Sequence, residues 1–300
     1  MRQILGCLAI AMLLACCNST KTKSISENQS SSISNPNLTK MNKKELAVAF
    51  VEAVTSQNAE KVRELANEDY IQHNPFLPTG LEPFIGLFPV LKENNTKAKQ
   101  VRIIQDGNYV AIHHLWTGAK PFGAEEMVSF DILRFDEERK IAEHWDALMP
   151  NTPPNPSGRT LLDGPTEIKD KADTETNKQF ISSLVEDVLF GKNPEKVTDY
   201  IGMETYHQHN PQIKDGLGGL QEAFQQLIAT NNMFRYTKSH KVLGDGNFVL
   251  TINEGEWQGK TQVFYDLFRI ENGKAVEHWD IIQPVPTEGL ANNNGMFDFK

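Results

Sequence analysis

The sequence predicts an α+β fold made of two tandem domains, each with N-terminal helices packed on a curved antiparallel sheet. The first observation is a repeat: Glu-His-Trp-Asp occurs at residues 143–146 and again at 277–280, and other motifs recur at the same shift of about 135 residues. The second is that apolar residues in each copy recur at helical spacing before they alternate at strand spacing. Helices followed by a meander of strands are typical of α+β domains, and 300 residues suffice for two of them.

The first helix of each copy is marked by a capping pattern and an apolar face. Asn42 lies three residues before Glu45, and Thr176 lies three residues before Gln179, an arrangement that satisfies the free amides at a helix start. Apolar side chains then share one face, namely Leu46, Ala49, Phe50, Ala53 and Val54 in the first copy and Phe180, Leu184, Val185 and Val188 in the second. We expect this face to contact the core of each domain and not a cofactor.

A Gln-His-Asn-Pro box follows a second short helix in each copy, at residues 72–75 and 208–211. A proline ends a helix, and the residue before it is biased toward extended geometry. The box histidines, His73 and His209, are therefore expected in a loop or at the start of a strand. They are candidate site residues, and Gln72 and Gln208 are secondary candidates. The alternative is that His and Asn beside the proline bond the local backbone.

The strand region of each copy opens with an Asp-Gly-Asn turn, at residues 106–108 and 245–247. A later apolar segment is joined by a short turn to the segment that ends in Glu-His-Trp-Asp, which predicts an antiparallel hairpin. Asp131 and Asp266 lie in the first strand of this hairpin and are secondary pocket candidates. A stretch rich in Pro, Ser and Gly between the copies is typical of a linker.

Side chains alternate between the two faces of the strand that carries Glu-His-Trp-Asp. His144 and Asp146 therefore share one face, as do His278 and Asp280 in the second copy. An imidazole beside a carboxylate can transfer protons near neutral pH, so these four residues are candidate acid/base groups. The alternative is a buried hydrogen-bonded pair that fixes the strand register.

The N-terminal region predicts export and lipid attachment. One Arg followed by an apolar run has the layout of a signal peptide over residues 1–16, and the run is too short for a permanent membrane span. Leu-Leu-Ala-Cys at residues 13–16 resembles the bacterial lipoprotein box, which implies a lipid on Cys16 and anchoring to a bacterial membrane, on its periplasmic or outer face. The alternatives are that Cys17 carries the lipid or that the leader is a plain cleaved signal peptide. Residues 17–41, rich in Ser, Asn, Thr and Lys, are expected to be a disordered tether.

The composition excludes several other classes of site. A net charge of -9 argues against binding to nucleic acid. All three cysteines lie in the leader, so the folded part has no disulfide, no cysteine nucleophile and no cysteine metal site. His113 and His114 are adjacent on one strand and point to opposite faces, so we expect no metal site there.

The order of helices and strands, the Gln-His-Asn-Pro box and the closing Glu-His-Trp-Asp strand resemble SnoaL-like polyketide cyclases, within the nuclear transport factor 2-like superfamily. The resemblance covers residues 42–150 and 175–287, and it leaves 151–174 as a linker and 288–300 as a C-terminal tail. It implies two cone-shaped domains. Domains of this fold commonly pair through their sheets, so we expect an intramolecular pseudo-dimer.

The chemistry implied by this resemblance needs no cofactor. A carboxylate in the cone removes a proton next to a ketone, and polar neighbours hold the enolate oxygen during an aldol ring closure. By position, the acid/base aspartate, its strand neighbour and the box histidine correspond to Asp146, His144 and His73 in the first copy and to Asp280, His278 and His209 in the second.

We therefore expect one or both domains to take a small apolar or polyketide-like molecule and to act on it by cyclase-like or ketone isomerase-like acid/base chemistry, without a metal or another cofactor. The alternative is that the same cones bind a ligand or a partner without any reaction. The catalytic and the binding hypotheses differ in the role of the carboxylates, because only the catalytic hypothesis needs Asp146 or Asp280 for turnover.

Overall fold

The structure is a computed structural model that describes residues 38–203 and 206–299, and residues 40–300 form one compact unit. The predicted signal peptide, Cys16 and most of the predicted tether lie outside the described residues. No helix in the described part of the chain is both long and apolar enough to cross a membrane.

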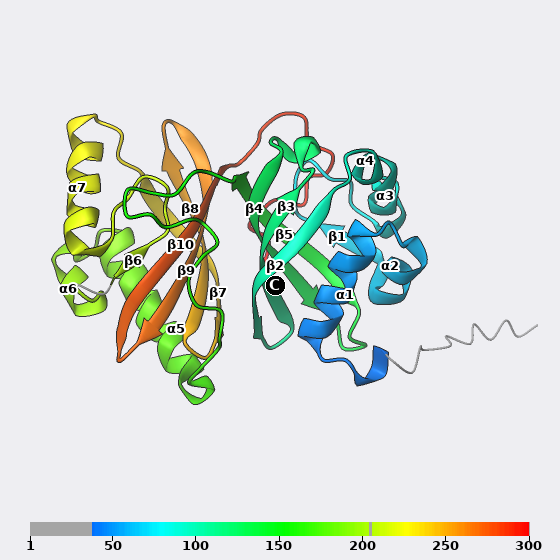
Figure 1. The fold of residues 1–300 in the computed structure, drawn as a ribbon, viewed down its shortest axis with the longest axis horizontal. Coiled ribbons are helices and arrows are strands. Elements are labelled where there is room, and N and C mark those ends of the chain that lie inside the picture. The colour runs from blue at the N-terminus through cyan, green and yellow to red at the C-terminus, as the bar shows by residue number, and fades with distance from the viewer. Residues whose placement is uncertain (1–37, 204–205, 300) are drawn as a thin grey trace, which may run out of the picture. The chain divides into compact units, whose positions relative to one another are not determined.

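The first half has four α-helices and a five-stranded sheet. The helices are α1 (Lys43–Thr55), α2 (Ala59–Leu65), α3 (Leu81–Ile85) and α4 (Phe88–Glu93). The strands are β1 (Ala66–Gln72), β2 (Lys97–Asp106), β3 (Tyr109–Thr117), β4 (Glu126–Phe135) and β5 (Ile141–Pro150), in the order β1-β5-β4-β3-β2. The helices group on one side of the sheet (Figure 1).

The second half repeats this plan with a different set of helices. They are α5 (Thr174–Leu184), which continues as a π-helical turn (Val185–Leu189), then α6 (Val197–Tyr200) and α7 (Gly216–Ala229). The strands are β6 (His207–Gln208), β7 (Arg235–Asp245), β8 (Phe248–Trp257), β9 (Lys260–Glu271) and β10 (Lys274–Pro284), in the order β6-β10-β9-β8-β7. The predicted α+β class, with two sheets that each follow helices, is confirmed.

The sheets are mixed, which corrects the expectation of purely antiparallel sheets. The meanders β2 to β5 and β7 to β10 are antiparallel, but β1 pairs parallel with β5 and β6 pairs parallel with β10. The first residue of each box is therefore the last residue of the parallel strand: Gln72 lies beside His144, and Gln208 lies beside His278. Alternation along one strand carries no information on the direction of its neighbour, and so it could not predict the parallel pairs.

The predicted capping box at α1 is confirmed, because the Asn42 side chain accepts from the Glu45 amide and the Glu45 carboxylate accepts from the Asn42 amide. The predicted cap at Thr176 is wrong, since α5 begins at Thr174, directly after a 3-10 turn. The Asn177 side chain instead donates to the carbonyl of Gly246 in the β7–β8 turn. It ties the helix to the sheet, and no side chain caps the start of the helix.

The two sheets pack face to face through one apolar core, as expected for an intramolecular pair. This core contains the fully buried Trp145 of β5 and Trp279 of β10, together with side chains of both sheets. At the edge strands, the Asp106 carboxylate accepts from the Gly244 amide and the Asp245 carboxylate accepts from the Gln105 amide, each at 3.0 Å. This exchange joins equivalent residues in both directions, as a local pseudo-twofold axis requires.

Gly164, in the segment between the halves, is expected to tolerate no side chain. Its φ is +95°, and a Cβ there would lie 2.5 Å from the Glu277 carboxylate and 2.8 Å from the Trp279 ring. We predict that Gly164→Ala lowers the free energy of unfolding by about 1–3 kcal/mol, measured by chemical denaturation. Gly158→Ala is the control, since Gly158 has a similar φ of +80° and open space around it. Equal losses in both variants would show that backbone strain, and not the collision, sets the cost.

Candidate functional site

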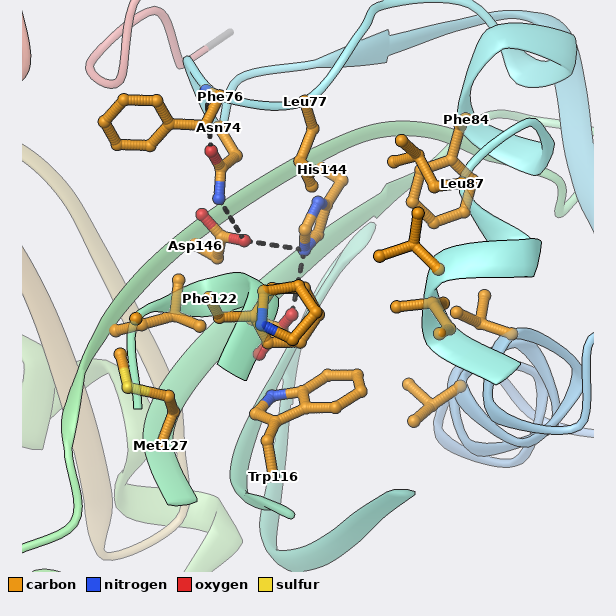
Figure 2. A pocket seen from close by; sticks show the side chains of 18 of the residues that line it. Asn74, Phe76, Leu77, Phe84, Leu87, Trp116, Phe122, Met127, His144 and Asp146 are labelled. Atoms are coloured by element: carbon orange, nitrogen blue, oxygen red, sulfur yellow. Dashed lines mark hydrogen bonds and ion pairs between the residues drawn. The ribbon is translucent and has the colours of Figure 1, made fainter. Parts of the chain in front are cut away.

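The first half contains a cavity of about 740 Å³ between the helices and the sheet. Apolar side chains form most of its wall, among them Phe50, Val54, Phe84, Leu87, Leu91, Trp116, Phe122, Met127 and Leu148. Asn74, His144 and Asp146 meet on one side of it, and Phe84 and Leu87 lie on the opposite side (Figure 2). A cavity that is apolar except for a few converging polar groups is the usual form of a small-molecule site.

Strand geometry brings the polar groups together. Successive residues of β5 point to opposite sides, so His144 and Asp146 face the cavity while Trp145 enters the core between the sheets. Asp131 of β4 lies directly opposite Asp146 in the antiparallel register and faces the same cavity. The predicted shared face of His144 and Asp146 is therefore confirmed.

The His144 ring is held between oxygen acceptors. Its Nε2 lies 3.0 Å from Asp131 Oδ1 and 3.9 Å from Asp146 Oδ2, and its Nδ1 lies 3.0 Å from Gln72 Oε1. Gln72 Oε1 also accepts from the Asn74 amide, and its Nε2 donates to the Tyr70 hydroxyl. Both ring nitrogens thus face oxygen, which favours the doubly protonated imidazolium.

Asp146 has one satisfied and one free oxygen. The Asn74 side chain donates to its Oδ2 at 3.0 Å, whereas its Oδ1 is buried and has no hydrogen-bond partner. Buried polar atoms are nearly always paired in proteins, so an unpaired carboxylate oxygen beside an apolar cavity is a feature that a bound molecule can use.

Burial and the neighbouring charges separate the pKa values of the cluster. Burial raises the pKa of Asp146 to about 6, against a smaller opposite effect of His144. Burial alone would also raise the pKa of Asp131, but the adjacent His114 and His144 hold it below its usual value. Burial would lower the pKa of His144, yet its hydrogen bond to Asp131 and the Asp146 charge raise it. Asp131 is therefore kept ionised, whereas Asp146 has a pKa close to neutral pH.

The raised pKa of Asp146 predicts a stability that depends on pH. The folded protein holds a proton on Asp146 up to about pH 6, whereas the carboxyl has a pKa of 3.8 without its surroundings. The folded state therefore binds more protons between these values, and stability falls by about 3 kcal/mol as pH rises through them. Asp146→Asn should lack this loss and gain stability relative to wild type between pH 4 and pH 7. The same difference in free energy of unfolding between Asp146→Asn and wild type at pH 4 and at pH 7 would contradict this.

The second half repeats the cluster in a cavity of about 980 Å³. His278 Nε2 lies 3.2 Å from Asp266 Oδ1, and the Asn210 side chain donates to Asp280 Oδ2 at 2.7 Å. The pKa of Asp280 is raised by burial, and its Oδ1 likewise has no partner. The Gln208 side chain contacts His278 Nδ1 at 3.1 Å.

The surroundings of the second aspartate differ between the halves. Asp266 accepts from the Tyr236 hydroxyl and from the Asn253 side chain, each at 3.1 Å. Asp131 instead contacts Ser129, and His114 Nε2 lies 3.4 Å from it. The first cluster thus has a second imidazole where the second cluster has neutral donors.

The two box histidines lie away from the cavities. His73 stacks on Trp145 with ring centroids 4.2 Å apart, and its Nε2 lies 3.0 Å from Glu143 Oε2. His209 stacks on Trp279 at 4.5 Å, and its Nε2 lies 2.9 Å from Glu277 Oε1. Both box histidines face the core between the sheets. In each half the structure therefore brings the predicted Asp and His of the last strand together in the cavity, and the predicted box histidine lies outside that cavity.

Other groups at the sites were missed by sequence reasoning. Asn74 and Asn210, which bond the cavity aspartates, belong to the repeated box, and their repetition was the available signal. Tyr70 and Tyr206, which line the cavities, also repeat. Tyr236 had no such signal, because its role depends on the alignment of β7 with β8 and β9.

The same clusters offer ligand atoms for a cation. One atom each of Asp131, His144 and Asp146 lies within 4.8 Å of the others, and the set Asp266, His278 and Asp280 does likewise. One imidazole and two carboxylates suit a divalent metal ion. Such an ion would replace the present contact between His144 and Asp131. The adjacent His113 and His114 form no such set among the described residues.

A comparison with protein families matches a segment of the first half. Residues 47–144 match the SnoaL-like domain family. A search of curated proteins gave no match. Together with the two mixed sheets, each preceded by helices, the match is consistent with two tandem domains of the nuclear transport factor 2-like fold.

Three similar solved structures each align with 36 to 40% of the chain. IdmH from Streptomyces antibioticus, provisionally named a polyketide cyclase, is 21% identical over 36% of this chain and 92% of its own, with a TM-score of 0.31. An NTF2-like protein of unknown function from Cytophaga hutchinsonii is 14% identical over 37% and 93%, with a TM-score of 0.31. A protein from Kribbella flavida, provisionally named a ketosteroid isomerase, is 16% identical over 40% and 91%, with a TM-score of 0.33.

Proposed function

We propose that the first half binds an apolar molecule with an enolisable ketone and moves a proton on it by general acid/base catalysis. The observation that carries this proposal is the free Oδ1 of Asp146, a buried carboxylate oxygen at the polar end of an apolar cavity. A base is most effective when its pKa lies near the working pH, and the pKa of Asp146 is raised to about 6.

The proposed step begins with the ketone carbon chain against the apolar wall. Asp146 Oδ1 takes a proton from the carbon next to the carbonyl. The electron pair of that C–H bond forms a carbon–carbon double bond, and the π electron pair of the carbonyl moves to its oxygen. The resulting enolate needs hydrogen-bond donors. The Tyr70 hydroxyl lines the cavity, accepts from Gln72 and keeps its own proton to donate, so it is the donor we assign. The His144 imidazolium, whose two N–H groups are held by Asp131 and Gln72, adds a positive charge beside the enolate.

The enolate then has two outcomes. Return of the proton from Asp146 to another carbon gives an isomer. Attack of the enolate carbon on a second carbonyl of the same molecule closes a ring, and the alkoxide formed there takes the proton from Asp146. Asp131 stays ionised throughout and keeps the imidazolium in place through its contact with Nε2. None of these steps requires a cofactor.

The test is exchange of the α-protons of 2-tetralone, an apolar enolisable ketone, followed by NMR in D2O. Because Asp146 must be ionised to act as the base, we expect the exchange rate to rise with pH and to level off above about pH 6. The measurement is repeated after dialysis against a chelator, which should leave the rate unchanged. Loss of exchange on chelation would assign the cluster to a metal ion instead.

The competing function is binding without reaction. It would apply if 2-tetralone bound to the wild-type protein and to Asp146→Asn with equal affinity while neither accelerated exchange. The apolar walls of both cavities would then serve as receptors, and the buried carboxylates would only orient a polar end of the ligand.

We further propose that the protein is exported and anchored to a bacterial membrane by a lipid on Cys16. The support is the leader sequence, with its apolar run followed by Leu-Leu-Ala-Cys. Mass spectrometry of the N-terminal peptide of the protein isolated from membranes should show a diacylglycerol-modified Cys16. An unmodified N-terminus downstream of the apolar run would support a plain signal peptide.

A further inference from the structure

The chain that follows the last strand of each half lies on the Gln-His-Asn-Pro loop of the other half. We call residues 155–165, which follow β5, the linker strap, and residues 291–299, which follow β10, the tail strap. The linker strap contacts residues 208–215 of the second half, and the tail strap contacts residues 72–79 of the first half.

The linker strap binds its loop through one buried asparagine. The Asn155 side chain donates to the main-chain carbonyls of Gln208, Asn210 and Ile213, at 2.6, 3.3 and 2.9 Å. Asn155 is only 5% exposed. The carbonyl of Thr160 also lies 2.7 Å from His209 Nδ1.

The tail strap binds the first loop through two asparagines. Asn292 donates to the carbonyls of Asn74 and Leu77, at 2.7 and 2.8 Å. Asn294 donates to the carbonyl of Gln72 at 2.8 Å. The carbonyl of Gly295 lies 2.9 Å from Nδ1 of the box histidine, His73.

Each strap therefore bonds three main-chain carbonyls and the Nδ1 of the box histidine in its loop. The four residues of one loop correspond to those of the other at one shift of 136 residues (208 − 72, 209 − 73, 210 − 74 and 213 − 77). The straps that bond them differ in sequence, Asn-Pro-Ser-Gly at 155–158 and Asn-Asn-Asn-Gly at 292–295. Buried main-chain carbonyls need donors, and in both loops an asparagine side chain from the other half's strap supplies them.

The loop that each strap holds also carries the side chains that fix the catalytic groups. Asn74 receives the bond from Asn292 on its carbonyl, and its side chain donates to Asp146. Gln72 receives the bond from Asn294 on its carbonyl, and its side chain accepts from His144. One loop residue thus connects each tail asparagine to a polar group of the first cavity. In the second half, Gln208 and Asn210 connect Asn155 to His278 and Asp280 in the same way.

We propose that Asn292 and Asn294 are positioning residues for the first site and that Asn155 is the positioning residue for the second. Each half then needs a segment from beyond the other half's last strand to hold its carboxylate and imidazole. The catalytic consequence rests on the proposed function, whereas the positioning itself does not.

The experiment compares two variants of the full chain. The first, called the tail variant, combines Asn292→Ala and Asn294→Ala, and the second is Asn155→Ala. Hydrogen–deuterium exchange with mass spectrometry reports on residues 70–80 and 206–216 separately. The tail variant should raise amide exchange of the first loop about tenfold and leave the second unchanged, and Asn155→Ala should do the reverse. Asn292→Asp with Asn294→Asp keeps the side-chain shape without the donors and should act like the alanines.

A second readout follows the imidazoles by NMR. The tail variant should shift the ring resonances of His144, because its Gln72 acceptor is no longer fixed, and leave the His278 resonances in place. Unchanged exchange in both loops, or equal increases in both, would overturn the proposal. If the double variant fails to fold, Asn294→Ala alone gives the same comparison. Because neither readout uses a substrate, both remain decisive if wild type shows no 2-tetralone exchange.

Discussion

Asp146→Asn is expected to slow α-proton exchange of 2-tetralone by about 10²- to 10⁴-fold, the usual contribution of a general base. The amide has the shape of the carboxylate but cannot take a proton. It can still accept from Asn74, which donates to Asp146 Oδ2 at 3.0 Å, so the cavity should keep its form. Binding of 2-tetralone, measured by the perturbation of NMR signals from the cavity, should therefore change little.

Asp280→Asn is the matched control, because Asp280 has the same place in β10 and the same bond from an asparagine. Comparison of the exchange rates of Asp146→Asn, Asp280→Asn and the double variant shows how much of the activity each half contributes. A first half that acts alone predicts full loss in Asp146→Asn and none in Asp280→Asn. An Asp146→Asn protein with the rate of wild type, in the presence of an active Asp280→Asn protein, would contradict our assignment of the base.

The strand pattern was sufficient to predict the inward faces of β5 and β10. Alternation is a local property, so His144 and Asp146 could be assigned to one face without knowledge of the partner strands. His73 shows where this reasoning ends. It lies one residue beyond the end of β1, and its contact with Gly295 joins residues far apart in the sequence. No local pattern specifies such a contact.

The fold class was similarly predictable and the details of the sheets were not. Repetition of Glu-His-Trp-Asp predicted two copies of one plan, and the copies indeed have the same strand order. The parallel placement of Gln72 beside His144 depends on where the chain returns after the helices. This placement is also what brings the box amides to the carboxylates, so the candidate site could be predicted from the sequence only in part.

Trp145→Ala is expected to cause the largest loss of stability among core substitutions in the first half, about 3–5 kcal/mol. The Trp145 ring is fully buried between the sheets and lies between His73 and Phe299, with ring centroids 4.2 and 4.5 Å away. Its indole nitrogen has no hydrogen-bond partner, so no hydrogen bond is lost with the ring. Because the ring contacts the tail strap, the vacated space cannot close without moving Phe299.

Urea denaturation followed by far-ultraviolet circular dichroism measures this loss without relying on tryptophan fluorescence. Trp257→Ala is the control: Trp257 is half-buried at the end of β8, where its indole donates to the carbonyl of Asn232, and its removal should cost about 1 kcal/mol. Since Trp145 joins one sheet to the other, its loss should also lower the cooperativity of unfolding. Equal losses in the two variants would mean that the contact between the sheets contributes little to stability, and each half would then have to be stable by its own helices and sheet.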